Sequence, residues 1–133
     1  MLFKNVNAVV LFVQDLARCV AFYRDKVGME VVFKDDVSTA FKMEKQDFLL
    51  LEFAAAAEMV GEAALGLHQG AGHEVLLCVD VEDVDAVYKT LMDKGVTFLK
   101  PPKDQPWGIR SAYFADPEGH LWELRRQIPS EQK

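Results

Sequence analysis

The stretch PWGIRSAYFADPEGHLWEL, residues 106–124, decides the fold of this chain. Residues 109–115 are rich in β-branched and aromatic side chains, which is typical of a strand. Asp116, Pro117 and Gly119 are turn residues, because aspartate hydrogen-bonds to nearby backbone, proline fixes φ and glycine adopts positive φ. Residues 121–126 then resume an extended pattern. The stretch therefore predicts a β-hairpin.

Glu123 is the residue of this hairpin that needs an explanation. Successive side chains of a strand point to opposite faces, so Trp122 and Leu124 share one face. Leu121, Glu123 and Arg125 share the other face. Burying a carboxylate in an apolar strand costs free energy unless a partner offsets it. We therefore expect the rest of the chain to supply partners for Glu123.

Composition limits the classes of function. Of the 133 residues, 50% are hydrophobic and 27% are charged, as in ordinary globular proteins. A net charge of −6 argues against nucleic-acid binding, which needs a basic face, and is compatible with cationic ligands. No apolar run is long enough to span a membrane, and the N-terminus has no secretory pattern, so a cytoplasmic location is expected. The two cysteines, Cys19 and Cys78, form no disulfide framework.

The chain reads as two βαβββ modules within one domain, residues 1–126. The first module covers about residues 6–53 and the second about 73–126. An Ala- and Gly-rich linker, 54–72, with room for a short helix at 54–59, joins them, and a polar tail follows at 127–133. The strands are predicted at 7–13, 29–33, 39–43, 48–53, 74–81, 96–99, 109–115 and 121–126. The helices are predicted from Asp15 to Gly28 and from Glu82 to Gly95, and a Pro-containing loop at 100–107.

An internal repeat supports this organisation. Residues 8–13 overlay residues 74–79, and Leu-Leu-Glu-Phe at 50–53 overlays Leu-Trp-Glu-Leu at 121–124. Each half is too small to bury its own sheet. We expect an α+β fold in which the two modules form a curved eight-stranded mixed sheet, with helices outside and a cleft inside.

The repeat also groups the acidic residues. It places Ala8 opposite Glu74, and Glu52 opposite Glu123, on the strand face that helices do not cover. Three carboxylates in one cavity raise one another's pKa or require a cation. That cation could be a metal ion, a cationic ligand, or an arginine such as Arg110 or Arg125. Oxygen ligands without histidine favour a hard ion such as Mg²⁺, Ca²⁺ or Mn²⁺.

Three features carry a family resemblance: the internal repeat, the pattern of Asp15-Leu16, Phe22-Tyr23 and Gly28, and the ending at 116–124. In these features the sequence resembles the vicinal oxygen chelate superfamily, which contains glyoxalases, bleomycin resistance proteins and extradiol dioxygenases. The resemblance covers about residues 6–126. It implies the two-module fold described above. It also implies a homodimer with clefts shared between subunits, while the lack of a long apolar run predicts no membrane partner.

In the metalloenzymes of this superfamily, four strand positions carry the metal ligands. In this chain those positions fall on Ala8, Glu52, Glu74 and Glu123. Because alanine has no donor atom, the first ligand is lost, and Glu74 stands where the third ligand is usually a histidine. The metal-free binding members, which hold cationic or aromatic ligands, agree better with these departures.

Two functions are therefore predicted. The first is binding of a small molecule in an acid-lined cleft, with no complete transition-metal site and no cofactor. The alternative is a lyase, isomerase or dioxygenase that uses a divalent metal (Mg, Mn, Ni or Zn) bound by Glu52, Glu74 and Glu123, with Glu123 catalytic. A structural partner domain with a vestigial cleft is a third class.

The predicted ligand-binding residues are polar or aromatic side chains expected to face the cleft: Phe12, Glu52, Glu74, Cys78, Trp107, Arg110 and Glu123. Three of these residues have two alternative roles. Cys78 is a nucleophile or an inert packed thiol. Trp107 packs on the sheet edge or stacks on a ligand. Arg110 orients a ligand carboxylate or neutralises the glutamates.

Overall fold

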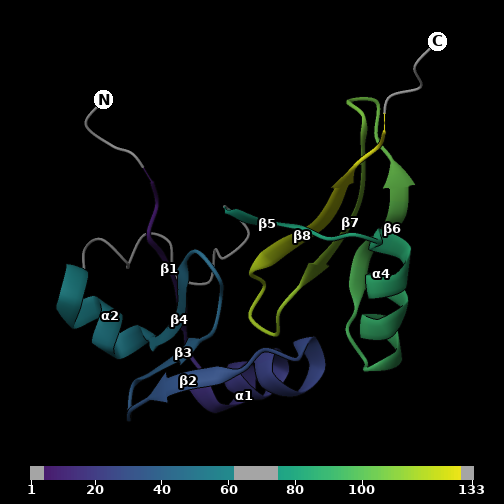
Figure 1. Cartoon of the computed structure of the whole chain (residues 1–133). Coiled ribbons are helices and arrows are strands. Elements are labelled where there is room, and N and C mark those ends of the chain that lie inside the picture. The colour runs from purple at the N-terminus through teal and green to yellow at the C-terminus, as the bar shows by residue number, and fades with distance from the viewer. Residues whose placement is uncertain (1–4, 62–74, 130–133) are drawn as a thin grey trace. The chain divides into compact units, whose positions relative to one another are not determined.

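The computed structural model describes residues 5–61 and 75–129 of the chain (Figure 1). The chain divides into two successive units, residues 1–70 and 71–133. Each unit contains one four-stranded sheet. The first unit contains β1 (Ala8–Val13), α1 (Leu16–Ala21), the π-helix η1 (Phe22–Val27), β2 (Val31–Lys34), β3 (Ser38–Phe41), β4 (Asp47–Glu52) and α2 (Phe53–Val60). The second contains β5 (Leu76–Asp80), α4 (Val84–Asp93), β6 (Phe98–Asp104), β7 (Ile109–Ala115) and β8 (Leu121–Gln127).

The sheet of the first unit has the strand order β1-β4-β3-β2, with β1 and β4 parallel and the other pairs antiparallel. Asp15 begins α1 by accepting a hydrogen bond from the backbone N of Arg18 at 3.1 Å, and Gly28 ends η1 with φ +87°. The ring of Tyr23, which is fully buried, contacts Phe48 at 5.3 Å between centroids. The helical segment therefore covers the sheet face that carries Phe48.

The second unit repeats this order as β5-β8-β7-β6, with β5 and β8 parallel. A row of aromatic rings joins α4 to the sheet, with centroids of Tyr88 and Phe98 4.6 Å apart and those of Phe98 and Phe114 5.3 Å apart. Phe114 stacks in turn on Trp122. The face with Trp122 and Leu124 is therefore the helix-covered core, as the alternation predicts. We call the opposite face the open face of the second sheet.

The α+β class and the two βαβββ modules are confirmed. Strand β7 has the predicted bounds, and α2 lies where the short linker helix is expected. Within the described ranges, no helix is long and apolar enough to cross a membrane. The predicted domain and linker limits, and the joining of the two sheets around one cleft, stay predictions.

Three local predictions are wrong. Strand β6 continues to Asp104 and so replaces the first part of the loop predicted at 100–107, because it is an edge strand with register shifts, where proline is tolerated. Phe53 begins α2, so the strand predicted at 48–53 ends at Glu52. Gln127 belongs to β8 rather than to the polar tail.

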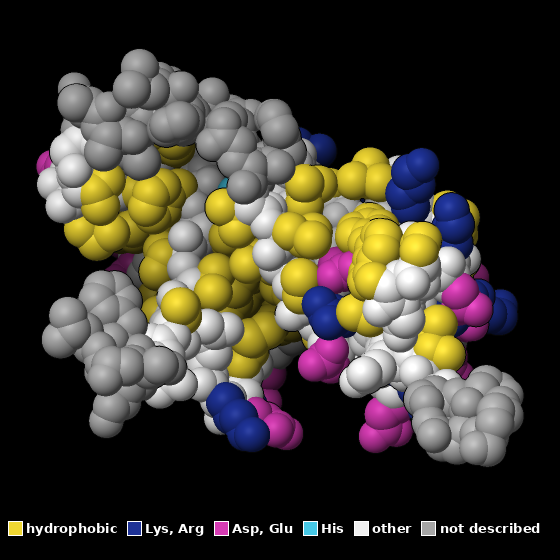
Figure 2. Space-filling model, turned by 90° about the horizontal axis from the view of Figure 1, so that it is seen from above, with side chains coloured by type: hydrophobic (Ala, Val, Ile, Leu, Met, Phe, Trp, Pro, Cys, Tyr) yellow, Lys and Arg dark blue, Asp and Glu magenta, His cyan; other side chains and the backbone are white. Residues whose placement is uncertain are grey.

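Large apolar side chains also remain on the surface. Figure 2 shows them among acidic and basic side chains on one side of the molecule. The most exposed of them include Phe33, Val75 and Trp107, with Leu76 43% exposed. Single exposed apolar residues are normal in proteins, but Leu76 lies on the same side of its strand as Cys78, and so on the open face. That face therefore presents apolar as well as polar surface.

Asp116 organises the turn of the β7-β8 hairpin. Its buried carboxylate accepts hydrogen bonds from the backbone N of Glu118 and of His120, both at 2.9 Å, and lies 2.7 Å from His120 Nδ1. Gly119 has φ +91°, which completes the turn. The turn chemistry read from the sequence is thus confirmed, and the carboxylate holds the hairpin closed.

Replacing Asp116 with Ala should lower the free energy of unfolding by about 2–4 kcal/mol, because two backbone N–H groups lose their acceptor. Asp116→Asn, which keeps one oxygen acceptor, should lower the free energy of unfolding by less. Urea denaturation followed by circular dichroism measures both. The control is Asp93→Ala, an exposed acid of α4. Equal stabilities of Asp116→Ala and this control would contradict the assignment.

Candidate functional site

Three side chains form a row across the open face of the second sheet. The strand register pairs Cys78 of β5 with Glu123 of β8, and Glu123 with Tyr113 of β7. Residues paired in this way lie on the same face, opposite the face of Trp122 and α4. We call these three residues the Glu123 row.

Glu123 has the partners that its burial requires. Only 5% of its surface is exposed. The Tyr113 hydroxyl donates a hydrogen bond to Glu123 Oε2 at 2.7 Å, and Arg125 Nη1 lies 3.7 Å from Oε1. A phenolic donor and a nearby guanidinium offset the cost of burying the carboxylate. The expectation of a partner for Glu123 is confirmed, and the partners come from its own hairpin.

The sequence reasoning missed Tyr113. The signal was present, because counting back equally from both sides of the turn pairs Ala115 with Leu121 and Tyr113 with Glu123. Turn chemistry identified the hairpin, but its register was not counted. The register is what brings the two side chains together.

Polar contacts extend the Glu123 row in both directions. Gln105 Nε2 donates to Ser111 Oγ at 3.2 Å, and Ser111 Oγ donates to the Tyr113 hydroxyl at 3.3 Å. Arg125 Nε also lies 3.4 Å from Asp80 Oδ1. In this order each hydroxyl accepts one hydrogen bond and donates the next, which strengthens the bond to Glu123. The tyrosine is thereby fixed in its orientation toward the carboxylate.

The same surroundings keep two groups protonated. Desolvation by neighbouring residues raises the pKa of the Cys78 thiol, the Glu123 carboxylate raises it further, and Arg125 opposes both. Desolvation raises the pKa of the Tyr113 phenol, and Glu123 adds to this, while Ser111 opposes it. Because a thiolate is the nucleophilic form of cysteine, this environment favours the inert reading of Cys78 over the nucleophilic one.

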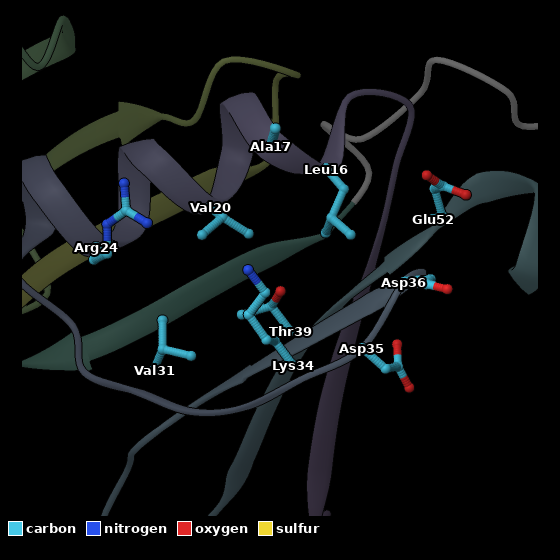
Figure 3. Close-up of a pocket in the computed structure, with 10 residues that line it drawn as sticks. All are labelled: Leu16, Ala17, Val20, Arg24, Val31, Lys34, Asp35, Asp36, Thr39 and Glu52. Carbon is cyan, nitrogen blue, oxygen red and sulfur yellow. The ribbon is translucent and has the colours of Figure 1, made fainter.

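Glu52 does not lie on the expected face. It pairs with Val13, which is fully buried on the face that the helices of the first unit cover, and it lines a hollow together with residues of α1 (Figure 3). If 8–13 is overlaid on 74–79, Phe12 corresponds to Cys78. Their parallel partners are Leu51 and Glu123, so Leu51 is the counterpart of Glu123. The predicted overlay of Glu52 on Glu123 is therefore wrong by one residue. Because β4 is apolar on both faces, the alternation of polar and apolar side chains could not reveal this error.

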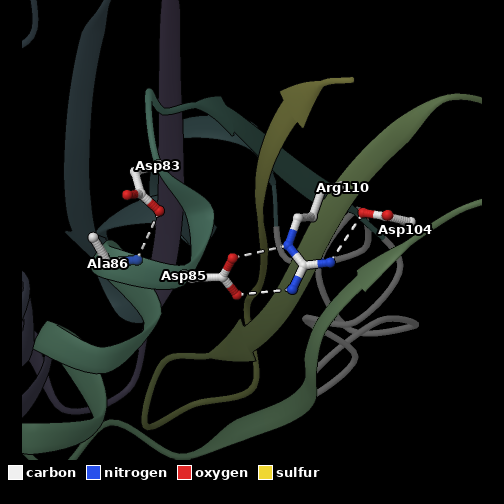
Figure 4. Close-up of polar contacts among 5 residues, drawn as sticks. All are labelled: Asp83, Asp85, Ala86, Asp104 and Arg110. Carbon is white, nitrogen blue, oxygen red and sulfur yellow. Dashed lines mark hydrogen bonds and ion pairs between the residues drawn. The ribbon is translucent and has the colours of Figure 1, made fainter. Parts of the chain in front are cut away.

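Arg110 lies on the face of the second sheet opposite Glu123, so it does not neutralise that carboxylate. It shares the helix-covered side of β7 with Ala112 and Phe114. Its guanidinium donates to both carboxylate oxygens of Asp85 on α4, at 3.0 and 2.9 Å, and to Asp104 at 2.9 Å (Figure 4). These contacts raise its pKa. Arg110 therefore joins α4 to β6 and β7, and it does not face Glu123.

The other predicted residues have different outcomes. Phe12 and Ala8 lie on the face of the first sheet that α1 does not cover, as expected. Trp107 is 63% exposed in the turn before β7, so most of its surface is not packed against the sheet. Glu74 lies outside the described residues. Its predicted role is untested.

The predicted metal-ligand set is not assembled by the part of the chain that the structure describes. Within residues 5–61 and 75–129, no three His, Cys, Asp or Glu side chains are grouped to hold a metal ion. Glu52 faces α1, and the neighbours of Glu123 are a phenol and a guanidinium rather than further ligands. The described residues thus fit a hydrogen-bonding site better than a metal site.

Residues 5–124 match the sequence profile of the Glyoxalase/Bleomycin resistance protein/Dioxygenase superfamily. The chain belongs to this superfamily. The resemblance stated from the hairpin ending and the internal repeat is confirmed. Proteins of this superfamily bind small molecules and often form dimers.

Individual relatives extend this result. YraH of Bacillus subtilis (strain 168), an uncharacterized protein, is 33% identical over 121 residues, which cover 89% of this chain and 94% of YraH. Metallothiol transferase FosB of Bacillus licheniformis is 30% identical over 122 residues, covering 90% of this chain and 73% of FosB. The crystal structure of a glyoxalase/bleomycin resistance protein/dioxygenase from Nocardioides superimposes with a TM-score of 0.85 at 25% identity, covering 100% of this chain and 92% of that one.

Replacing Arg110 with Ala should lower the melting temperature by about 2–5 °C, because α4 loses a two-pronged ion pair to the sheet. Arg110→Lys should have an intermediate effect, since lysine keeps the charge and loses the planar fork. Scanning calorimetry at low salt and in 1 M NaCl measures both, and salt should reduce the difference. Lys89→Ala, which removes a long and exposed ion pair, is the control. A larger fall in melting temperature for Lys89→Ala than for Arg110→Ala would contradict the role of Arg110.

Replacing Glu123 with Gln should lower the pKa of Cys78, because a carboxylate that raises it is removed while Arg125 remains. At pH 8, the thiol should then react faster with iodoacetamide than in the unmodified protein. Mass spectrometry across a pH series measures the reaction, and buried Cys19 serves as an unreactive reference in each folded sample. An unchanged or higher pKa of Cys78 would contradict the assignment.

Proposed function

We propose that the open face of the second sheet binds a small molecule, and that it does so without a complete transition-metal site. The observation that supports this is the pairing of buried Glu123 with Tyr113 and Arg125. A carboxylate that accepts a phenolic hydrogen bond and faces a guanidinium already has its charge offset. It therefore has less need of a metal cation.

The side chains around Glu123 indicate the kind of ligand. Arg125 is 35% exposed and offers N–H donors, Asp80 offers a carboxylate, and the Cys78 thiol is exposed. Leu76, on the same side of β5, offers apolar surface. A ligand with an apolar or aromatic body and several polar groups would use all of them. In this proposal, Trp107 of the second unit adds an aromatic ring for the ligand, the predicted ligand-binding role of Phe12 is kept, and the protein is a homodimer that shares its clefts between subunits.

A divalent-metal enzyme, a lyase, isomerase or dioxygenase, is the second candidate. It is supported by the relative named a metallothiol transferase. Of the predicted ligands, the described residues would contribute only Glu123, because Glu52 faces α1. In such an enzyme the metal would supply Lewis acidity when bound. Its remaining ligands would have to include Glu74 or other groups beyond the described ranges.

Two measurements on the same preparation separate the candidates. The first is elemental analysis of protein purified without chelator, for which we expect well below one transition-metal ion per chain. The second is a fragment screen by NMR, in which at least one fragment should shift the amide signals of Cys78, Tyr113 and Glu123. Tyr113→Phe removes the hydroxyl that donates to Glu123, and Glu123→Gln removes the negative charge of the acceptor, so both should weaken binding of that fragment.

Asp47→Asn is the matched control, since this exposed acid lies at the start of β4 in the other unit. It should leave fragment binding unchanged. One tightly held transition metal per chain, lost in Glu123→Gln, would contradict the proposal and favour the enzyme. Fragments that bind elsewhere and never at the Glu123 row would contradict both candidates.

A further inference from the structure

A hollow in the first unit lies apart from the Glu123 row. It has a volume of about 660 Å³ and lies between α1 and the β2-β3 turn, with Glu52 at the end of β4 forming part of its rim (Figure 3). Volumes of roughly 300–1,000 Å³ are typical of sites for small molecules. All of its lining residues belong to this one unit. We call it the α1 pocket.

The wall of the α1 pocket is apolar. Leu16, Ala17 and Val20 of α1 line it, and Val31 of β2 lies on the other side. Residues one turn apart on a helix share a face, which explains why Leu16 and Val20 lie together. Ala17 is exposed, so the wall is open to solvent at that point. This surface suits the apolar body of a ligand.

The charged side chains of the α1 pocket fall into two groups. Arg24 is committed to Asp25, with hydrogen bonds of 2.7 and 2.9 Å, and Asp35 Oδ1 accepts from the backbone N of Val37 and of Ser38. These residues hold local structure.

The second group comprises Lys34, Asp36 and Glu52. Among the residues that the structure describes, none of these three side chains has a hydrogen-bond or ion-pair partner. The pocket therefore offers two uncommitted carboxylates and one uncommitted ammonium. In Figure 3, Asp36 and Glu52 lie together at one end, while the Lys34 side chain lies between them and the Val20–Val31 walls.

We propose that the α1 pocket is a second small-molecule site, which takes an amphipathic primary amine that also carries an oxygen acceptor. The ligand ammonium would bind Glu52 and Asp36, and its apolar body would lie against Leu16 and Val20. Lys34 would donate to the oxygen. The excess of carboxylates over free ammonium groups at this site, and the net charge of −6, favour a cation over an anion.

Three probes of matched shape test the charge requirement. Tyramine has the ammonium, the ring and the oxygen. 4-Ethylphenol lacks the ammonium, and 3-(4-hydroxyphenyl)propionate replaces it with a carboxylate. In methyl NMR titrations, tyramine should shift the signals of Leu16, Val20 and Val31, with an affinity at least about fivefold higher than either of the other probes.

Four variants locate the site. Glu52→Gln should weaken the affinity for tyramine about fivefold, because the ligand ammonium loses a charge-assisted contact. Ala17→Phe should fill the pocket and abolish the shifts, and because Ala17 is exposed the fold should persist. Asp47→Asn, at the other end of β4 from Glu52, should change nothing. Glu123→Gln should leave the tyramine shifts of Leu16, Val20 and Val31 unchanged, because Glu123 does not line this pocket, which makes failure of this proposal distinguishable from failure of the proposed function.

Equal binding of the three probes would overturn the charge argument. Shifts that survive Ala17→Phe, or the absence of any shift at Leu16, Val20 and Val31, would overturn the site itself.

Discussion

The hydrogen bond from Tyr113 to Glu123 is the interaction on which the rest of the open face depends. A carboxylate that is 5% exposed must have partners. The hairpin register supplies the phenol of Tyr113, and Arg125, the next open-face residue of β8, supplies a guanidinium. Ser111 and Gln105 then orient the phenol. This chain of donors offsets the charge of the buried carboxylate, and that carboxylate raises the pKa of Cys78 beside it.

The two faces of the second sheet differ in the contacts that organise their side chains. On the helix-covered face, Phe114 and Trp122 pack beneath α4, and Arg110 secures that helix through Asp85. On the open face, the polar side chains are organised by hydrogen bonds rather than by packing. The hairpin turn built on Asp116 serves both faces, because it sets the register that places Trp122 in the core and Glu123 outside it.

Much of the fold could be predicted from the sequence, but less of the site. The final hairpin was predicted closely, because its turn chemistry and its alternation agree. The Pro-containing part of β6 was missed, since an edge strand tolerates proline. Glu52 was assigned to the wrong face because β4 is apolar on both sides. The partners of Arg110 on α4 arise from tertiary packing, which no local pattern encodes.

A double-mutant cycle with Tyr113→Phe and Glu123→Gln tests the central claim most directly. If the buried carboxylate depends on the phenol, the two changes should be coupled by about 1–3 kcal/mol in the free energy of unfolding, measured by urea denaturation of protein freed of metal with a chelator. Effects that add within about 0.3 kcal/mol would contradict the claim, because independent residues show no coupling.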